Sequence, residues 1–432
     1  MFIKNVAAAG LAMALLTSPL TAQESAVPEG VPHLNHVFMI MMENHSYSEV
    51  LNNPNAPFIN QLAHSANIGT SYFGVAHPSF TNYIEVLGGS NFGLLNDHTP
   101  DWHSTTCTPN IISGITAFDT SATPPNCPIY GKGTDAATPA IDYTNEASSP
   151  AGVFNIDGIQ SIPASHEIVG KSIGHQLVAA GLSWKSYQES LPITGANKVN
   201  FSDGVFTDAT DFTAIKPTLT PPLTSNDLVD LYAAKHNPFV YFRDIEEGYD
   251  PNNNLRNIVS FEGQRGLFAD LATGHVPSFS FIAPNQCNDQ HGRGNAGAFC
   301  NYDPNSNGTQ AGLNPALIKR GDVEVERLVK AIKASPAWKE GRNAIVILWD
   351  ENDYSAAPET NQVLLIVDTN YGSRGLQSNV HYTHYSLLRS IEAGFGIPCL
   401  NHACDSNVKV MTDLFSGSDK RRNNDDDDNE GN

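Results

Sequence analysis

Acidic and amide side chains directly follow several strongly apolar runs of this chain. The run Val37 to Met42 holds six apolar residues without alternation, and Glu43 and Asn44 come next. A run without alternation predicts a strand that is buried on both faces, as in a parallel sheet. Open α/β sheets bind ligands at the carboxyl ends of such strands. The same order recurs at four further predicted strands: Phe239 to Phe242 before Arg243, Asp244 and Glu246; Phe279 to Ala283 before Asp289 and His291; Ala344 to Trp349 before Asp350 and Glu351; and Val363 to Val367 before Asp368.

This repeated pattern predicts a site for a divalent metal. Carboxylates gathered at one sheet edge repel each other unless a cation or protons neutralise them. Carboxylate and amide oxygens, with some imidazole, are ligands that suit hard divalent cations. A polar turn after a strand explains any single run equally well, but the repetition favours a metal site.

Ser79 is a candidate nucleophile. It stands just before a short predicted helix in which Tyr83, Val86 and Leu87 share a face and which ends at Gly88. The free N–H groups at a helix N-terminus favour an anion. A serine hydroxyl needs a base or a metal to become a nucleophile at neutral pH. No GxSxG motif surrounds Ser79, so a lipase-type triad is not indicated. The alternative is that Ser79 only caps the helix.

The composition indicates an acidic, exported protein. The 432 residues are 40% apolar, enough for a large core. The formal charge is −21, and residues 416–432 account for only −3 of it, with six acids and three bases. We therefore expect no nucleic acid partner and no stable membrane association. Residues 1–22 are predicted to be a signal peptide, because a basic start precedes an apolar segment too short to span a bilayer.

The predicted organisation follows from these features. We expect a single folded domain at 23–415 and a disordered acidic tail at 416–432. We expect the protein to be secreted or periplasmic. The Thr-, Pro- and Ser-rich stretch Asn96 to Ser161 is predicted to be a disulfide-pinned insertion over the site. Helices are predicted at Ala56–Ala66, at Asp322–Ala334 with Asp322 as its cap, and at Ser386–Ala393 with Gly394 as its stop.

Six cysteines fit an exported protein and form three local pairs along the chain. Zinc ligation by these cysteines is the less favoured alternative, since no CxxC spacing occurs. Proximity in sequence predicts the disulfides Cys107–Cys127, Cys287–Cys300 and Cys399–Cys404.

Six segments between about His36 and Leu400 occur in the order MMENHSYSEVL, HPSFTNYIEVLGGS, WKSYQES, APNQCNDQHG, ILWDENDYS and HYTHYSLLRSIEAGFG. Together they resemble the phosphoesterase family of bacterial phospholipases C and acid phosphatases, in the alkaline phosphatase superfamily. Thr81 departs from the family pattern HPSxPNY, in which proline precedes the asparagine. The resemblance implies an alkaline phosphatase-like α/β fold, with a largely parallel central sheet covered by helices on both faces.

The resemblance also implies roles for particular residues. Ser79 would form a phosphoryl-enzyme, and Asn82 and Asn44 would hold phosphoryl oxygens during in-line displacement. The implied metal ligands are Glu43, Asn44, Asp350 and Glu351 for one ion, and Asp289, His291 and His384 for a second ion or the phosphate. His381 is the alternative to His384, and His77 is interpreted as structural.

Three functions remain open on the sequence alone. The first is an acid phosphatase-type phosphomonoesterase that acts on a small phosphate ester, and the second is a phospholipase C-type phosphodiesterase. The third is a secreted, non-catalytic protein that binds metal or phosphate. The acidic charge and the lack of an amphipathic surface helix favour the first over the second. The intact set of Glu43, Ser79, Asp350 and Glu351 argues against the third.

Overall fold

The computed structural model describes residues 26–77, 79–92, 168, 170–191, 231–293, 297–304, 306–352 and 361–416, with two short strands at 108–109 and 126–127. The predicted signal peptide, most of the predicted insertion and residues 417–432 lie outside the described residues. Within the described part of the chain, no helix has both the length and the apolar character needed to cross a bilayer.

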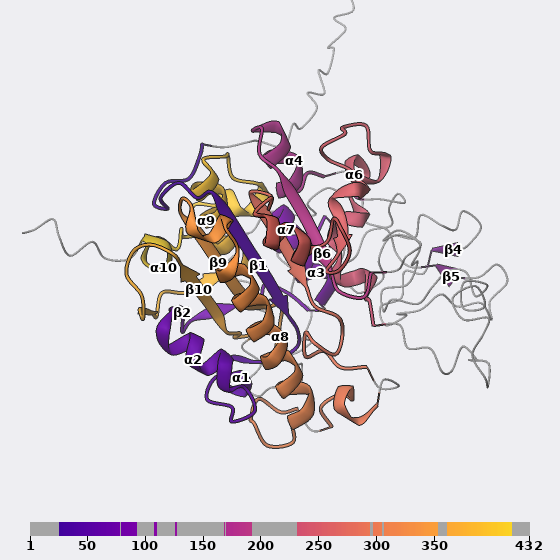
Figure 1. The fold of residues 1–432 in the computed structure, drawn as a ribbon, viewed down its shortest axis with the longest axis vertical. Coiled ribbons are helices and arrows are strands. Elements are labelled where there is room, and N and C mark those ends of the chain that lie inside the picture. Colours follow the sequence, from indigo (N-terminus) through magenta and orange to yellow (C-terminus); the bar gives the residue numbers. More distant parts are fainter. Residues whose placement is uncertain are drawn as a thin grey trace, which may run out of the picture.

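An eight-stranded sheet lies at the centre of the molecule (Figure 1). Its order is β11 (Gln377–Ser378), β2 (Asn67–Gly69), β10 (Leu365–Thr369), β9 (Asn343–Trp349), β1 (His36–Met42), β8 (Phe279–Ala283), β6 (Trp184–Gln188) and β7 (Ile258–Ser260). The central strand β1 runs parallel to both neighbours, with Val37 opposite Phe279 and Ala344. Residues Val37 to Met42 are all buried, which is why their sequence shows no alternation.

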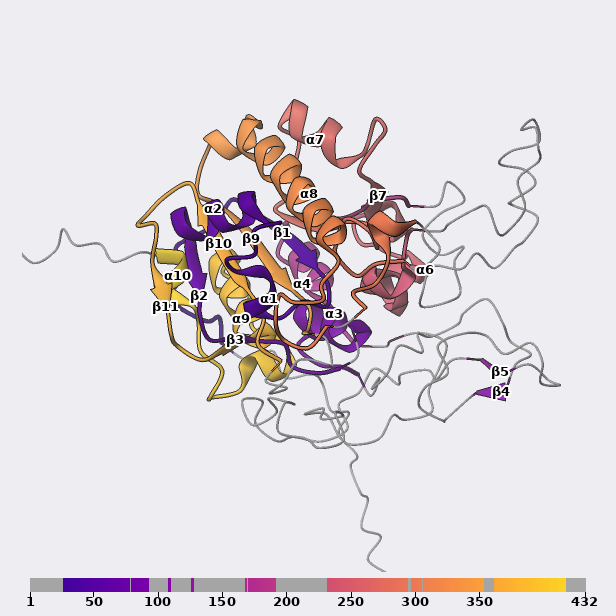
Figure 2. The same ribbon diagram turned by 90° about the horizontal axis from the view of Figure 1, so that it is seen from below.

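Helices cover both faces of this sheet (Figure 2). On one face α8 (Pro315–Ala334) packs against α2 (Pro57–Ser65) and α7 (Leu267–Thr273), and on the other α3 (Ser79–Gly88) packs against α4 (Ile173–Ala179) and α9 (His384–Phe395). The predicted fold class, a largely parallel sheet between two helical layers, is therefore confirmed.

The remaining elements are short. The helices are α1 (Tyr47–Val50), α6 (Arg243–Glu247) and α10 (Thr412–Ser416), and the strand pairs are β3 (Tyr72–Phe73) with β12 (Tyr382–Thr383) and β4 (Thr108–Pro109) with β5 (Asn126–Cys127). The 3-10 helices are η4 (Ala234–His236), η5 (Pro238–Tyr241), η6 (Leu255–Asn257), η7 (Ala298–Cys300), η8 (Ala337–Lys339) and η9 (Asn401–Cys404).

The predicted strand at Phe239 to Phe242 is wrong. Phe239 to Tyr241 belong to the 3-10 helix η5, which starts with Pro238, and Phe242 follows it in an isolated β-bridge with Ile168. Proline fixes a helix-like φ and has no N–H for a sheet, so it favours the start of a helix. The aromatic run is buried for a different reason, because the ring of Phe239 stacks on Trp184 with ring centroids 4.3 Å apart.

The predicted contribution of Asp368 to the strand-end edge is also wrong. Strand β10 runs antiparallel to β9, and Asp368 lies opposite Ile345, near the start of β9. Asp368 is therefore near the amino edge of the parallel strands, where it forms ion pairs with Lys333 and Arg374.

Two predicted helix boundaries need correction. Helix α8 is capped by Asn314, whose side chain accepts from the backbone N–H groups of its first turn. Asp322 lies inside that helix, and its carboxylate accepts the N–H of Ile59 in the first turn of α2, at 2.8 Å. Helix α9 continues through Gly394 to Phe395 and is capped by Gly396, whose φ of 66° is the left-handed conformation that glycine adopts without strain.

Two of the predicted disulfides are present. Cys287 is bonded to Cys300, and Cys399 is bonded to Cys404. The predicted pair Cys107–Cys127 falls outside the described residues. The first of these bonds joins the loop after β8 to η7, so it restrains the segment that carries Asp289 and His291.

Candidate active site

Backbone hydrogen bonds bring the ends of β1, β8 and β9 together. The N–H of Glu43 donates to the carbonyl oxygen of Asp289 at 2.9 Å, and the N–H of Asp350 donates to that of Met42 at 3.0 Å. Asn44 adopts φ of 51°, a conformation that asparagine tolerates, and its N–H donates to Asp350 Oδ1 at 3.1 Å. The carboxylates predicted from three separate strands therefore gather at one sheet edge.

Ser79 is the first residue of α3 and faces this edge. Its Oγ lies 3.2 Å from Glu43 Oε2 and 3.0 Å from Glu351 Oε1, and the residue is only 1% exposed. A hydroxyl has one proton, so Ser79 donates to one carboxylate at a time. The hydroxyl therefore lies between two acids that could accept its proton or share a cation with it.

Asn82, one turn further along α3, fixes the segment before Ser79. Its Oδ1 accepts the N–H groups of Val75 and Ala76 at 3.0 and 3.1 Å, and its Nδ2 donates to the carbonyl of Ala76 at 2.7 Å. The same Nδ2 lies 3.2 Å from Glu351 Oε2. These contacts give Asn82 a positioning role, and its bond to a phosphoryl oxygen stays a prediction.

His77 also reaches Glu351. Its Nδ1 lies 2.6 Å from Glu351 Oε2, and both side chains are 5% exposed. The sequence interpretation of His77 as structural did not foresee this contact with a site carboxylate.

His236 on η4 is a site residue that the sequence reasoning missed. Its Nε2 lies 2.8 Å from Glu43 Oε1, and its Nδ1 lies 3.2 Å from Asp289 Oδ2. The ring stacks on Tyr83 of α3, with centroids 5.0 Å apart and an angle of 5° between the planes. No apolar strand precedes His236, so the strand-end pattern could not find it; a histidine next to Lys235 in a short polar segment was the only local signal.

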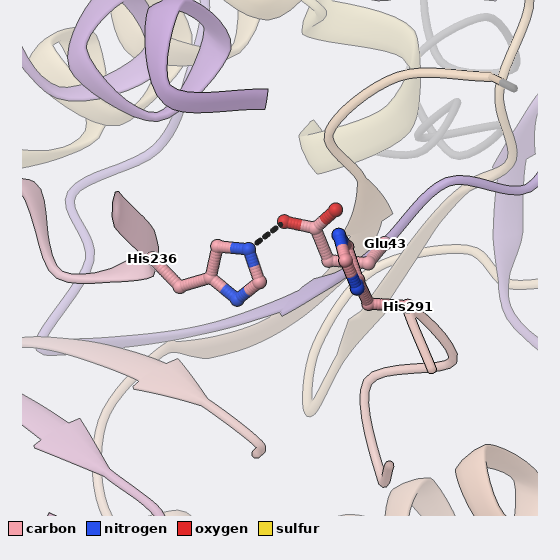
Figure 3. A group of neighbouring side chains, drawn as sticks. All are labelled: Glu43, His236 and His291. Atoms are coloured by element: carbon pink, nitrogen blue, oxygen red, sulfur yellow. Dashed lines mark ion pairs between the residues drawn. The ribbon is translucent and has the colours of Figure 1, made fainter. Parts of the chain in front are cut away.

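Glu43, His236 and His291 form a cluster that could hold a metal. One ligand atom from each lies within 4.8 Å of the others. Figure 3 shows the Glu43 carboxylate between the two imidazole rings. His291 follows β8, where its Nδ1 lies 2.9 Å from the carbonyl of Gly292 and its backbone N–H donates to Asp289 Oδ1. Because a carbonyl only accepts, Nδ1 carries the proton and the lone pair is on Nε2, which lies 3.5 Å from the ammonium of Lys235.

Charges in the cluster shift several pKa values. Burial alone would raise the pKa of Glu43, but His236, His291 and Lys235 outweigh burial and hold it well below its usual range. Burial opposes the charged form of His236, yet Glu43 and Asp289 raise its pKa to about 9. Burial, together with Lys235, lowers the pKa of His291 to about 4. At neutral pH His236 is therefore cationic and His291 is neutral.

The acids are less completely neutralised. Burial raises the pKa of Asp289 to about 6, although His236 opposes the shift. Burial and the carboxylates of Glu43 and Glu351 raise the pKa of Asp350 well above its usual value. Several carboxylates in one buried space are costly without more positive charge than His236 supplies.

Two oxygen atoms show that the site fits a cation. Asp350 Oδ2 and Asn44 Oδ1 are buried and have no hydrogen-bond partner within the described part of the chain. Buried polar atoms without a partner cost free energy. Both atoms are hard oxygen donors and belong to residues joined by the Asn44–Asp350 hydrogen bond, so the donor set suits a divalent metal.

His384 and His381 have other contacts. His384 Nε2 lies 2.6 Å from the carbonyl oxygen of Asp350, and its Nδ1 lies 2.6 Å from the hydroxyl of Tyr72. Both ring nitrogens are thus engaged, and His384 holds the end of β9 in place. His381 stacks on Phe73 with centroids 4.7 Å apart, and no contact of the described residues joins it to the cluster.

The comparisons with known proteins place this chain in a family. A model of the phosphoesterase family matches residues 49–300, more than half of the chain. The chain therefore belongs to the phosphoesterase family. It is 24% identical over 382 residues to an acid phosphatase of Aspergillus fumigatus, covering 88% of this chain and 59% of that protein. It is 22% identical over 411 residues to a phosphatidylinositol-3-phosphatase of Mycobacterium tuberculosis, covering 93% of this chain and 91% of that protein.

The chain thus spans about three fifths of the fungal relative and most of the mycobacterial one. Among solved structures, it is similar to a protein of the alkaline phosphatase superfamily from Vibrio parahaemolyticus, with a TM-score of 0.41 and 9% identity over 90% of this chain and 74% of that chain. This similarity is low, and the family assignment rests on the sequence match.

Proposed function

We propose that this protein is a metal-dependent phosphomonoesterase of acid phosphatase type, with Ser79 as its nucleophile. The observation that carries the proposal is the buried hydroxyl of Ser79 between Glu43 and Glu351, at 3.2 and 3.0 Å. Family membership and the names of the relatives, an acid phosphatase and a phosphatidylinositol-3-phosphatase, support a phosphate ester as the substrate. Both names are those of phosphatases, which favours a monoester over the diester of a phospholipase C.

One or two divalent ions would complete the site. Glu43, Asn44, Asp350 and Glu351 would hold one ion, because their oxygens include the two buried atoms that lack a hydrogen-bond partner among the described residues. The cluster of Glu43, His236 and His291 would hold a second ion if His236 loses its proton, or the phosphate if His236 keeps it. When bound, such an ion would lower the pKa of the serine hydroxyl and draw charge from the phosphoryl oxygens.

The residues of the chain would accept the proton of Ser79 and balance the charge of the phosphate. Glu351, whose Oε1 lies 3.0 Å from Ser79 Oγ, would accept the proton of Ser79 as Oγ forms a bond to phosphorus. The bond to the leaving oxygen breaks in the same step, and that oxygen takes a proton from solvent. The N-terminus of α3, where Ser79 lies, would direct the positive end of the helix dipole toward the phosphoryl group. His236, cationic at neutral pH, balances the negative charge of the phosphate. A water molecule then attacks phosphorus and gives a proton to solvent, the bond between phosphorus and Ser79 Oγ breaks, and Oγ takes its proton back from Glu351.

We also propose that the protein is exported. The disulfides Cys287–Cys300 and Cys399–Cys404 support an oxidising compartment, outside the cytoplasm. The predicted signal peptide at 1–22 and the domain limits 23–415 remain predictions.

Hydrolysis of paired chromogenic esters tests the proposal. Purified protein is assayed with nitrophenyl phosphate and with nitrophenyl phosphorylcholine across a range of pH, before and after treatment with a chelator. We expect turnover of the monoester to exceed that of the diester by about two orders of magnitude or more, a difference of roughly 3 kcal/mol in transition-state binding. Chelation should abolish turnover, and a divalent metal should restore it.

Two results would replace this function with another. A preference for the diester would make the protein a phospholipase C-type phosphodiesterase. A folded, metal-loaded protein that binds inorganic phosphate but hydrolyses neither ester would be a binding protein.

A further inference from the structure

A second concave site lies near the opposite edge of the sheet. A cavity of about 630 Å³ is lined by Trp184 at the start of β6, by Val276 and Pro277 before β8, and by Val178 at the end of α4. Figure 1 shows β6 running from α4 toward α3, which carries Ser79. A strand rises about 3.3 Å per residue, so roughly 15 Å of β6 separates this cavity from the candidate active site. The two sites are therefore distinct.

Basic side chains surround this cavity. Lys185, Arg256, Arg265 and His275 are among its lining residues, whereas no acidic side chain of the described residues lines it. We call these four residues the basic cluster. Such a group is unusual for a chain whose formal charge is −21. Like charges that converge on one concave surface raise the local potential and attract anions.

Backbone contacts hold the cluster together. The guanidinium of Arg265 donates through Nη2 to the carbonyl oxygen of Arg256 at 3.0 Å. The ammonium of Lys185 in turn lies 3.4 Å from the carbonyl oxygen of Arg265. These bonds place the Arg265 guanidinium against the backbone of Arg256 and the Lys185 ammonium against the backbone of Arg265, and the neutral carbonyl groups leave both positive charges in place.

Most of this positive charge is not paired with carboxylates of the described residues. Lys185 forms an ion pair with Asp270, which also accepts the hydroxyl proton of Tyr187. Within the part of the chain that the structure describes, Arg256 and Arg265 form no ion pair. Two exposed guanidinium groups therefore stand at the cavity with most of their N–H donors available.

We propose that this cavity is a second ligand site that binds the phosphate group of a small molecule. Guanidinium groups match phosphate oxygens with paired N–H donors, which makes arginine well suited to phosphate. The cavity volume falls in the range typical of small-molecule sites. Val178, Leu182 and Val276 give it an apolar wall for the organic part of a phosphate ester. The proposal does not depend on the function proposed for Ser79.

Titration calorimetry of the full-length protein with inorganic phosphate tests this site. The parent is compared with Arg256→Gln/Arg265→Gln and with a control of equal charge change, Lys319→Gln/Lys339→Gln, whose two lysines are exposed and outside the cavity lining. We expect the arginine variant to lose one phosphate site or to weaken it about tenfold or more, because charge-assisted hydrogen bonds are lost. The lysine control should bind phosphate as the parent does.

Two further comparisons sharpen the result. Arg265→Lys keeps the charge but loses the paired donors, so its affinity should fall between those of the parent and the double variant. Phenylphosphonate, which resists hydrolysis, distinguishes the source of the phosphate group: tighter binding than inorganic phosphate indicates an ester held by the apolar wall, and weaker binding indicates the free anion.

The proposal for the active site and the proposal for the cavity can be refuted separately. If Ser79 is not part of a phosphate site, the parent shows one phosphate site and the arginine variant none, which still supports the cavity. If the arginine variant binds phosphate with the same number of sites and the same affinity as the parent, the cavity is not a phosphate site. Equal weakening in the lysine control would likewise overturn the proposal, because it would reflect net charge alone.

Discussion

Replacing Ser79 with alanine separates the two roles that the sequence allows for this residue. The change removes a hydroxyl that donates to Glu43 or Glu351 at 3.2 or 3.0 Å. A hydrogen bond to a charged group contributes roughly 1.5–3 kcal/mol, and a lost helix cap costs about 1 kcal/mol. We therefore expect Ser79→Ala to lower the free energy of unfolding by at most about 3 kcal/mol.

That loss is too small to explain a large fall in turnover. A domain with the usual stability of about 5–15 kcal/mol stays almost entirely folded after losing about 3 kcal/mol. Loss of a nucleophile instead lowers kcat by several orders of magnitude while substrate still binds. The two measurements, urea unfolding and steady-state hydrolysis of nitrophenyl phosphate, thus distinguish a nucleophile from a cap.

Ser335→Ala is a matched control. Ser335 is also a buried serine, and its hydroxyl accepts the N–H of Ala337 at 3.3 Å beside η8, far from the strand ends that form the site. We expect this variant to lose a similar free energy of unfolding and to keep the turnover of the parent. Acid quenching during turnover should also trap a phosphoryl group on the peptide that contains Ser79 in the parent.

A simple result would refute the reasoning. If metal-replete Ser79→Ala hydrolyses the monoester at nearly the rate of the parent, Ser79 is not the nucleophile. Ser79→Thr is a second test variant, because it keeps a hydroxyl. Partial turnover in the threonine variant and none in the alanine variant would support attack by the hydroxyl. The added methyl group must fit a position that is only 1% exposed, which lowers the expected rate.

Three other predictions follow from the same structure. Asp350→Asn should lower both the bound metal, measured by elemental analysis, and the turnover, with the fold intact by circular dichroism; full activity in metal-free protein would contradict it. Burial raises the pKa of Glu324 to about 7, so its protonated form favours the folded state. This contribution to the free energy of unfolding is complete below about pH 4.5 and is lost as the pH rises through 7. Glu324→Gln should remove up to about 3 kcal/mol of that pH-dependent loss in unfolding experiments at pH 5 and 8, whereas Glu326→Gln, at a more exposed position, should not. Mass spectrometry of exported protein should find an N-terminus near residue 23 and the linked pairs Cys287–Cys300 and Cys399–Cys404; free thiols at these positions would count against export in this form.

The sequence by itself determined the strands that carry the site. Each of β1, β8 and β9 is a local run of buried apolar residues, and burial on both faces leaves a pattern that needs no knowledge of the neighbours. The polar residues that follow these runs, Glu43, Asp289 and Asp350, must then lie at the carboxyl edge when the strands are parallel. The N-terminus of α3 at Ser79 was predictable for the same reason, since its apolar face and its terminal glycines are local features.

Only the tertiary structure decided which other residues join them. His236 is held by Glu43, Asp289 and the ring of Tyr83, all distant in sequence, so no local pattern marks it. The direction of β10 depends on its partners β9 and β2, and its antiparallel pairing removes Asp368 from the site. Strand direction and ring stacking arise from contacts between remote segments, whereas a hydrophobic run reports only on burial of its own residues.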